Sequence, residues 1–372
     1  MDNVYIISFS IPVIVCLFWF FELIFSSGKN SIAKKHLAVF MFCGFITFLG
    51  ELLFHNNILF IYRPLYFFIV FFTILQIPTL YIYLLRLTES NLKIKRYIKH
   101  IVFPFLVATL LLFIHFIYLN NAESISVFRN FYNPENFNNK QNIAYSVELF
   151  ARYSFLSVSV FYLILINFKI KKHLKKVLNY YSEVCKKRLR WIGISSFFYI
   201  AMVLISSTVC NPTTKDIIYN PEYTIIFPFL FLGITFWIIG FLGNRQELIV
   251  IPDQETIEVK PISNELKHTI IQKLNITMRD RKIYLQQDLT LPELAREIGT
   301  NRFYLSKIIN EEFNCNYNNY INKFRIEYAE NLMKENSDLS IKEISTLSGF
   351  NCYMSFIRNF KKFKKESPDF DV

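Results

Sequence analysis

The sequence lacks the residue patterns that usually accompany metal binding, phosphate binding or acid–base catalysis. Its six cysteines are scattered, and none belongs to a CxxC pair or to a cluster with histidine. This spacing excludes the common zinc sites and indicates no disulfide framework. The sequence has no glycine-rich phosphate-binding loop and no residues spaced as a catalytic dyad. We therefore predict that the protein is not an enzyme and holds no metal or cofactor.

Charged residues are scarce as well, at 19% of the chain, whereas phenylalanine occurs 41 times and tyrosine 22 times. The long apolar runs lie almost entirely before residue 244. Residues 1–243 hold 22 Lys and Arg against 10 Asp and Glu, whereas residues 244–372 hold 19 of each kind. The net charge of +12 therefore belongs to the apolar part and gives no argument for nucleic-acid binding.

Seven apolar runs have about the 20 residues that a membrane-spanning helix needs. Five are uncharged, at residues 4–21, 65–85, 101–119, 191–210 and 223–242. Two contain charges: run 37–54 includes Glu51, and run 147–168 includes Glu148 and Arg152. The first run lacks the basic start and the small-residue cleavage site of a signal peptide, so we interpret it as a retained span. The sequence predicts a seven-helix transmembrane bundle that forms a sensor or anchor over residues 1–243.

Lys and Arg gather in alternate loops of this bundle. The loops after the first, third and fifth spans are basic, and the last of these is the densest, whereas the loops between them are poor in charge. Because basic loops favour the cytoplasmic side, the N-terminus is predicted outside and the C-terminal third in the cytoplasm. The long outer loop 120–146 is either a ligand site or a solvated connector.

Four ionisable residues in the apolar runs are candidates for a function within the membrane: Glu51, His115, Glu148 and Arg152. An ionisable group at this depth is costly, and it usually marks a functional site or has a partner. Glu148 and Arg152 are four residues apart, so one helix face would let them pair with each other. The sequence leaves the functional and the structural interpretation open.

Residues 244–282 have the character of a linker followed by an amphipathic helix. Pro252 and Pro261 lie in an acidic stretch, and residues 264–282 then carry apolar side chains at helical spacing. We expect this helix to pack either on the C-terminal domain or on the same helix of a second copy.

A capped helix, a glycine and a second helix follow. Thr290 and Glu293 have the spacing of a capping box, and Gly299 ends the first helix. The second helix is predicted to begin after Asn301 and to bury Leu305, Ile308 and Ile309. This order is typical of a helix-turn-helix unit, whose second helix enters the major groove of DNA.

The same pattern recurs about 50 residues later. Ser340 and Glu343 form the second capping box, Ile344 and Leu347 are expected on an apolar face, and Gly349 ends the helix. The next helix is predicted to bury Phe356, Ile357 and Phe360, after a turn that is one residue longer than in the first unit. A continuous helix over residues 318–333 is expected between the units.

Three stretches of this region resemble the AraC-type transcription regulators. LTLPELAREIGTNRFYLSKIINEEF resembles their first unit, YNNYINKFRIEYAENLM their connecting helix, and LSIKEISTLSGFNCYMSFIRNFKKF their second unit. The resemblance covers residues 283–368 and is greatest to the membrane-anchored members common in Bacteroidetes. It implies DNA binding and transcription control. The sequence departs from the family at its end, where Lys364-Lys365-Glu366-Ser367-Pro368 lacks the usual glycine.

The candidate DNA contacts are polar residues on the outer faces of the two second helices. Arginine and asparagine read base edges, whereas lysine more often meets phosphate. The candidates are Asn301, Arg302, Ser306, Lys307, Asn310, Asn351, Tyr353, Ser355, Arg358, Lys361 and Lys362.

Together these observations predict an all-α protein whose residues 283–370 form a double helix-turn-helix domain with a homeodomain-like fold. The leading hypothesis is a one-component transcription regulator in the inner membrane of a bacterium, controlled by a signal sensed in or across the membrane. Its expected partners are double-stranded DNA, the lipid bilayer, a second copy of the chain and an unknown signal ligand. The alternative is a membrane receptor whose cytoplasmic module binds a protein rather than DNA.

Overall fold

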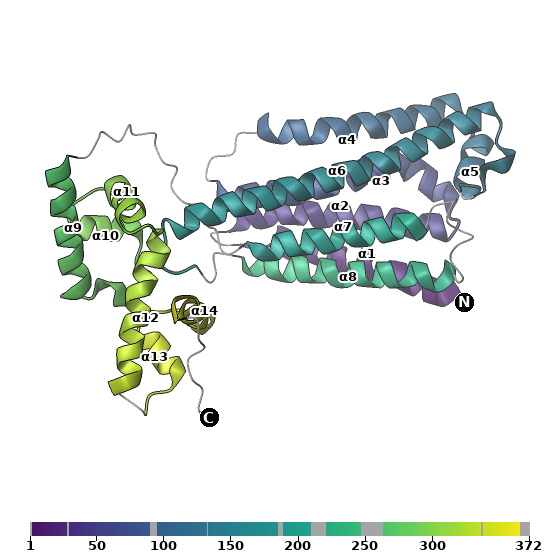
Figure 1. Ribbon diagram of the computed structural model, residues 1–372. Coiled ribbons are helices and arrows are strands. Elements are labelled where there is room, and N and C mark those ends of the chain that lie inside the picture. The colour runs from purple at the N-terminus through teal and green to yellow at the C-terminus, as the bar shows by residue number, and fades with distance from the viewer. Residues whose placement is uncertain are drawn as a thin grey trace. The chain divides into compact units, whose positions relative to one another are not determined.

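The computed structural model describes residues 2–27, 30–89, 95–131, 133–184, 189–209, 221–246, 263–335 and 338–364. These residues form helices and turns (Figure 1), and their only β-structure is an isolated antiparallel bridge between Tyr181 and Thr290. The chain divides into two compact units. Unit 1 comprises Met1–Ile170 and Leu189–Val250, and unit 2 comprises Lys171–Arg188 and Ile251–Val372.

Unit 1 is a bundle of long helices that run side by side in Figure 1. Six described helices are long and apolar enough to cross a membrane, and each predicted span coincides largely with a helix of this unit, the fourth running from α4 (Lys95–Phe113) into the π-helical turn η1 (Ile114–Tyr118). The sixth predicted span lies in α7, part of which falls outside the residues whose side chains are described. The long helices are α1 (Asp2–Ile24), α2 (Ser31–His55), α3 (Leu59–Thr88), α4 (Lys95–Phe113), α6 (Asn139–Leu178), α7 (Arg190–Val209) and α8 (Pro221–Arg245).

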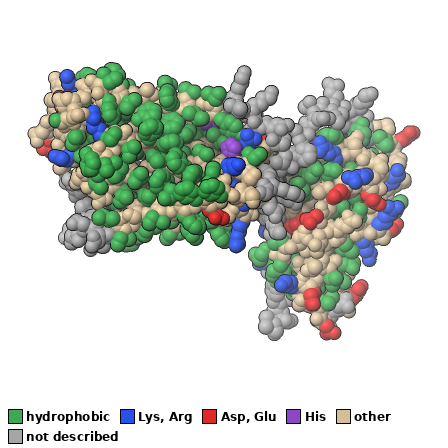
Figure 2. Space-filling model, turned by 180° about the vertical axis from the view of Figure 1, so that it is seen from behind, with side chains coloured by type: hydrophobic (Ala, Val, Ile, Leu, Met, Phe, Trp, Pro, Cys, Tyr) green, Lys and Arg blue, Asp and Glu red, His purple; other side chains and the backbone are tan. Residues whose placement is uncertain are grey.

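These helices are apolar on their outer as well as their inner faces. On α4, Ala108 and Leu111 are fully buried, whereas Phe105, Leu106 and Leu110 are exposed. Figure 2 shows hydrophobic side chains covering the visible face of unit 1, whereas unit 2 displays charges of both signs. A helix that is apolar all round needs an apolar environment on its outer face.

The loop predicted at residues 120–146 is partly helical and packs into the bundle. Helix α5 (Asn121–Arg129) begins at a capping box of Asn120 and Glu123, and it buries Ser124, Val127 and Phe128. It lies at the end of the bundle where the N-terminus also lies (Figure 1). A π-helical turn, η1 (Ile114–Tyr118), leads from α4 towards it. The solvated-connector interpretation is therefore wrong for this part of the loop, because it contributes to the core.

Unit 2 contains the helices predicted for the C-terminal third. They are α9 (Asn264–Arg279), the short 3-10 helix η5 (Ile283–Leu285), α10 (Leu291–Glu297), α11 (Arg302–Glu312), α12 (Tyr317–Glu335), α13 (Ile341–Leu347) and α14 (Tyr353–Lys364). Helix α9 buries Ile270, Leu274 and Met278 in the same core cluster as Leu305 and Ile309 of α11. Of the two packing alternatives for this helix, the structure thus has α9 on its own domain.

The turns of the two helix-turn-helix units confirm the roles expected of their glycines. Gly299 has a φ angle of 71° and Gly349 one of 85°, a region that residues with a Cβ atom rarely adopt. Four residues separate α10 from α11, whereas five separate α13 from α14, as the spacing predicts. Both capping boxes are formed.

Two expectations for unit 2 need correction, and others concern residues outside the described ranges. Leu347 is 51% exposed and is absent from the apolar face that buries Ile344. Cys352 is bonded in a disulfide, which the scattered cysteine spacing did not indicate, whereas Cys16, Cys43 and Cys315 are free thiols. The proline-containing linker and the terminal residues 365–372 lie outside the described residues.

Candidate functional sites

Helices α11 and α14 are the second helices of the two helix-turn-helix units, and each is held by a buried apolar stripe. On α11, Leu305, Ile308 and Ile309 are at most 1% exposed. On α14, Phe356 and Phe360 pack into a separate cluster with the second unit's core. Each buried stripe fixes which face of its helix points into the domain. The side chains on the opposite face are the ones that can meet a ligand.

The structure places ten of the eleven predicted DNA contacts on exposed or half-buried positions. Arg302 and Ser306 are half-buried, whereas Lys307, Asn310, Asn351, Tyr353, Arg358, Lys361, Lys362 and Asn301 are exposed. Ser355 is the exception, because only 2% of its surface is exposed. It lies one position before Phe356, on the face that packs inward, so we remove it from the candidate interface.

Several of these side chains already have partners. The Asn301 Oδ1 accepts hydrogen bonds from the backbone N–H groups of Phe303 and Tyr304, at 3.0 and 2.9 Å, and so caps α11. This leaves its Nδ2 group for a ligand, whereas bidentate contact with adenine needs both the oxygen and the nitrogen. Asn351 donates to Asp288 Oδ1 over 2.7 Å.

Positive charge is concentrated on α14. This helix carries Arg358, Lys361, Lys362 and Lys364 and no acidic residue, whereas the two basic residues of α11 are balanced by Glu311 and Glu312. Lys362 donates to Asn319 Oδ1, and Lys364 pairs with Glu330, both at 2.6 Å. Within residues 263–364 as described, Arg358 and Lys361 make no ion pair, and both are exposed. These two cations are the best placed on α14 to meet phosphate.

The connecting helix α12 carries a buried polar face that sequence analysis did not single out. Arg325 is fully buried. Its Nε donates to the Tyr284 carbonyl and its Nη2 donates to the Gln286 carbonyl, both over 2.6 Å. The same Nη2 group donates to Ser182 Oγ over 3.2 Å. Burial lowers the pKa of Arg325 to about 10, and the nearby Glu183 carboxylate opposes that shift.

Ser182 belongs to a short segment, residues 179–184, that follows α6 and is part of unit 2. The Ser182 carbonyl accepts from Asn318 Nδ2 over 2.7 Å and from Asn322 Nδ2 over 3.2 Å. Its backbone N–H donates to the Leu289 carbonyl, and the Leu291 N–H donates to the Tyr180 carbonyl. Asn318, Asn322 and Arg325 recur at helical spacing on α12, which is the signal that would have revealed this face.

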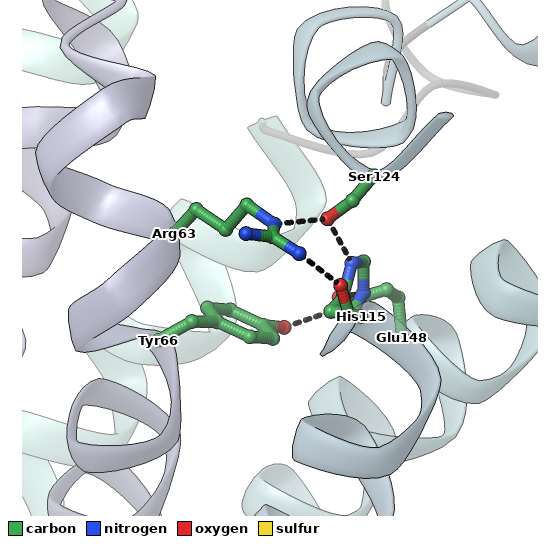
Figure 3. A network of polar contacts seen from close by, with 5 residues as sticks. All are labelled: Arg63, Tyr66, His115, Ser124 and Glu148. Carbon is green, nitrogen blue, oxygen red and sulfur yellow. Dashed lines mark hydrogen bonds and ion pairs between the residues drawn. The ribbon is translucent and has the colours of Figure 1, made fainter. Parts of the chain in front are cut away.

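In unit 1, two of the four predicted intramembrane residues meet in one buried network (Figure 3). One ring nitrogen of His115, Nε2, lies 2.7 Å from Glu148 Oε1, and the other, Nδ1, lies 2.9 Å from Ser124 Oγ. Tyr66 donates to Glu148 Oε2. Arg63 donates to Ser124 Oγ over 3.3 Å and to the His115 carbonyl over 2.8 Å.

This network has a consistent assignment of donors and acceptors when His115 carries its proton on Nε2. Arg63 then donates to Ser124, Ser124 donates to His115, and His115 donates to Glu148. His115 lies in the π-helical turn η1, a conformation that often marks functional sites. Each carboxylate oxygen of Glu148 is thereby held in place.

The other two predicted residues lie nearby but outside the hydrogen bonds of Figure 3. Glu51 Oε2 lies 3.5 Å from His55 Nε2, one helical turn away on α2. The Arg152 guanidinium carbon lies 4.0 Å from the ring centroid of Phe131. Glu148 uses its two oxygens for His115 and Tyr66, so its position is set by neighbouring helices as well as by its own.

Comparison with known proteins covers the C-terminal part of the chain. Residues 294–369 match the family model described as a helix-turn-helix domain. A stretch of 127 residues is 28% identical to an uncharacterized HTH-type transcriptional regulator of Staphylococcus aureus (strain COL), covering 34% of this chain and 17% of that protein. The HTH-type transcriptional regulator YtdP of Bacillus subtilis (strain 168) is 31% identical over 83 residues, which are 22% of this chain and 11% of that protein.

The chain thus spans less than a fifth of the length of these curated relatives. No solved structure matches the chain. The matched residues include most of α10 and all of α11 to α14. The C-terminal part of this protein is therefore a helix-turn-helix domain of the AraC type, the class of domain that binds DNA in transcription regulators.

Proposed function

We propose that the protein is a membrane-bound one-component transcription regulator. In this proposal, unit 1 anchors the chain in the inner membrane of a bacterium with the N-terminus outside, and unit 2 binds double-stranded DNA in the cytoplasm. The observation that carries the proposal is the exposed basic face of α14 in a tandem helix-turn-helix domain, on a chain whose described residues include six apolar helices of membrane-spanning length.

The hydrogen-bonded segment after α6 supports a route for the signal. Helix α6 runs without interruption from Asn139 to Leu178, and the division between the units falls within it, after Ile170. Residues 180–182 then bond to the start of α10 and to α12. A movement of this span relative to the bilayer therefore acts on the helix that connects the two DNA-reading units. A ligand drives such a shift only when it binds the two arrangements with different affinity.

A second copy of the chain is part of the proposal. Residues 244–372 are electrically neutral, so phosphate attraction alone gives one domain modest affinity for DNA. Two copies held in one membrane raise the effective concentration of the second domain at paired sites.

The proposal is tested by chromatin immunoprecipitation of the tagged full-length protein, with parallel fractionation of membranes. We expect the protein in the salt-washed membrane fraction and enriched at discrete DNA sites. The double variant Arg358→Ala/Lys361→Ala should lose the enrichment, whereas Lys334→Ala, which removes an exposed lysine of α12, should keep it. Unchanged enrichment in the double variant would favour the receptor alternative, in which unit 2 binds a protein.

A further inference from the structure

Unit 1 contains a partly open cavity of about 200 Å³ beside the buried network of Figure 3. Its wall includes residues of α2, α3, α6, α7 and α8, together with Phe128 of α5 and the nearby Phe131. A cavity of about 150 Å³ in another protein is known to hold benzene. The space in unit 1 therefore suits a ligand with one ring or a branched alkyl group.

Most of the cavity wall is apolar, and nine of its twenty lining residues are aromatic. The rings include Phe48, Phe54, Tyr62, Phe155 and Phe229. Such a wall favours an apolar or aromatic body, because aromatic faces bury a large area in a defined geometry.

The same wall carries charges of both signs. Glu51 and Arg152 both line the cavity, and they are close enough to interact electrostatically. The Glu51 side chain is 45% exposed despite its place in an apolar run, and one of its oxygens, Oε2, lies 3.5 Å from His55 Nε2. Glu148 also lines the cavity, but His115 and Tyr66 hold its two oxygens.

We infer that this cavity binds a small zwitterion of the α-amino acid class with an apolar or aromatic side chain. Its ammonium group pairs with Glu51, its carboxylate pairs with Arg152, and its side chain fills the aromatic space. A ligand with one charge pairs with one of these residues and offers nothing to the other, which makes it the poorer complement in a low-dielectric site. The buried network holds Glu148 and the α5 wall in position and so shapes the cavity.

This inference deepens the proposed function, and it rests on that function for the role of the ligand as a signal. Binding itself is measured separately, by calorimetry on the full-length protein in lipid nanodiscs. The probes are L-phenylalanine, phenethylamine and hydrocinnamate, which share a ring and carry both charges, the positive charge alone and the negative charge alone. We expect each single-charge probe to bind about 10- to 100-fold more weakly than L-phenylalanine, the range for one charged hydrogen bond.

The variants test which residue meets which charge. Glu51→Gln should weaken the binding of L-phenylalanine and phenethylamine but not that of hydrocinnamate, whereas Arg152→Gln should weaken the binding of L-phenylalanine and hydrocinnamate but not that of phenethylamine. A merely structural role would weaken all three probes together. The matched controls are Glu22→Gln and Arg129→Gln, which change exposed residues outside the cavity wall.

Equal binding of the three probes to the wild-type protein, or binding of none, overturns the inference. The same preparations are assayed for bound DNA, both without a probe and with L-phenylalanine. Bound L-phenylalanine without bound DNA leaves the ligand site standing and contradicts the proposed function. Bound DNA without binding of any probe leaves the proposed function standing and contradicts the ligand site.

Discussion

Arg325 Nη2 lies 3.2 Å from the hydroxyl oxygen of Ser182, although 143 residues separate the two in the chain. The guanidinium carbon of Arg325 lies 5.5 Å from the ring centroid of Phe350, a residue in the turn of the second helix-turn-helix unit. The Arg325 Nε donates to the Tyr284 carbonyl in η5, and Nη2 also donates to the carbonyl of Gln286, which follows η5. One buried side chain thus connects the segment after α6, the approach to the first unit and the turn of the second.

Replacing Arg325 with methionine should destabilise unit 2 by about 3 kcal/mol, because several buried carbonyls lose a charged donor at once. That loss corresponds to roughly 100-fold faster hydrogen exchange of the α12 amides that open only when the unit unfolds. Arg296→Met is the control, since Arg296 is exposed on α10. Equal exchange rates in the two variants would show that the buried contacts of Arg325 contribute little.

Asn318→Ala should loosen the segment after α6 without unfolding the domain. Asn318 Nδ2 donates to the carbonyls of Ser182 and Tyr181, at 2.7 and 3.3 Å, and both carbonyls lose this partner in the variant. A cost of about 1.4 kcal/mol raises hydrogen exchange of the Ser182 amide about tenfold. Asn331→Ala, at an exposed position of the same helix, should leave that amide unchanged. A faster exchange throughout α12 would instead indicate loss of the whole fold.

The two turn glycines should differ in their tolerance of alanine. At Gly299 an added Cβ meets nothing closer than the flexible end of Lys273 at 3.8 Å, so the cost is the left-handed backbone alone, about 1–2 kcal/mol. At Gly349 it meets the backbone of Leu285 at 2.8 Å and of Tyr284 at 2.9 Å. We expect Gly349→Ala to cost at least about 3 kcal/mol, because backbone must move as well. Thermal unfolding monitored within unit 2 compares them, and equal shifts in Tm would contradict this ordering.

Local sequence was sufficient to predict the helix-turn-helix units. Capping boxes, turn glycines and apolar spacing act within a few residues, so Ser340, Glu343 and Gly349 could be assigned before any contact was known. The length and apolar character of the runs in unit 1 likewise predicted helices of spanning length. These features depend on residues that are close in the sequence and not on tertiary packing.

The faces of α13 and α14 were harder to predict, because they depend on packing between helices. Helix α14 contacts both α12 and α13. Its buried face therefore includes Ser355 and Asn359 as well as Phe356 and Phe360. A single apolar stripe does not reveal such a wide buried face. Leu347 shows the opposite error, since an apolar residue at helical spacing remained exposed.

Contacts over long sequence separations had no local signal at all. The network of Glu148 depends on Tyr66, His115 and Ser124, which come from three other helical elements. The predicted pairing of Glu148 with Arg152 considered one helix only. The sequence singled out Glu148 and His115 but not the partners that the bundle supplies.

The exposed cations of α14 should set the salt dependence of DNA binding. Each phosphate contact that is lost lowers the slope of log Kd against log salt concentration by about 0.9. Arg358→Ala and Lys361→Ala should therefore each reduce that slope by about one, as measured by fluorescence anisotropy with a DNA site recovered by immunoprecipitation. Lys334→Ala, on α12, is the matched charge control, and Ser355→Ala should leave the slope unchanged because Ser355 is buried. If Lys334→Ala lowers the slope as much as Arg358→Ala, DNA binding does not involve the α14 face.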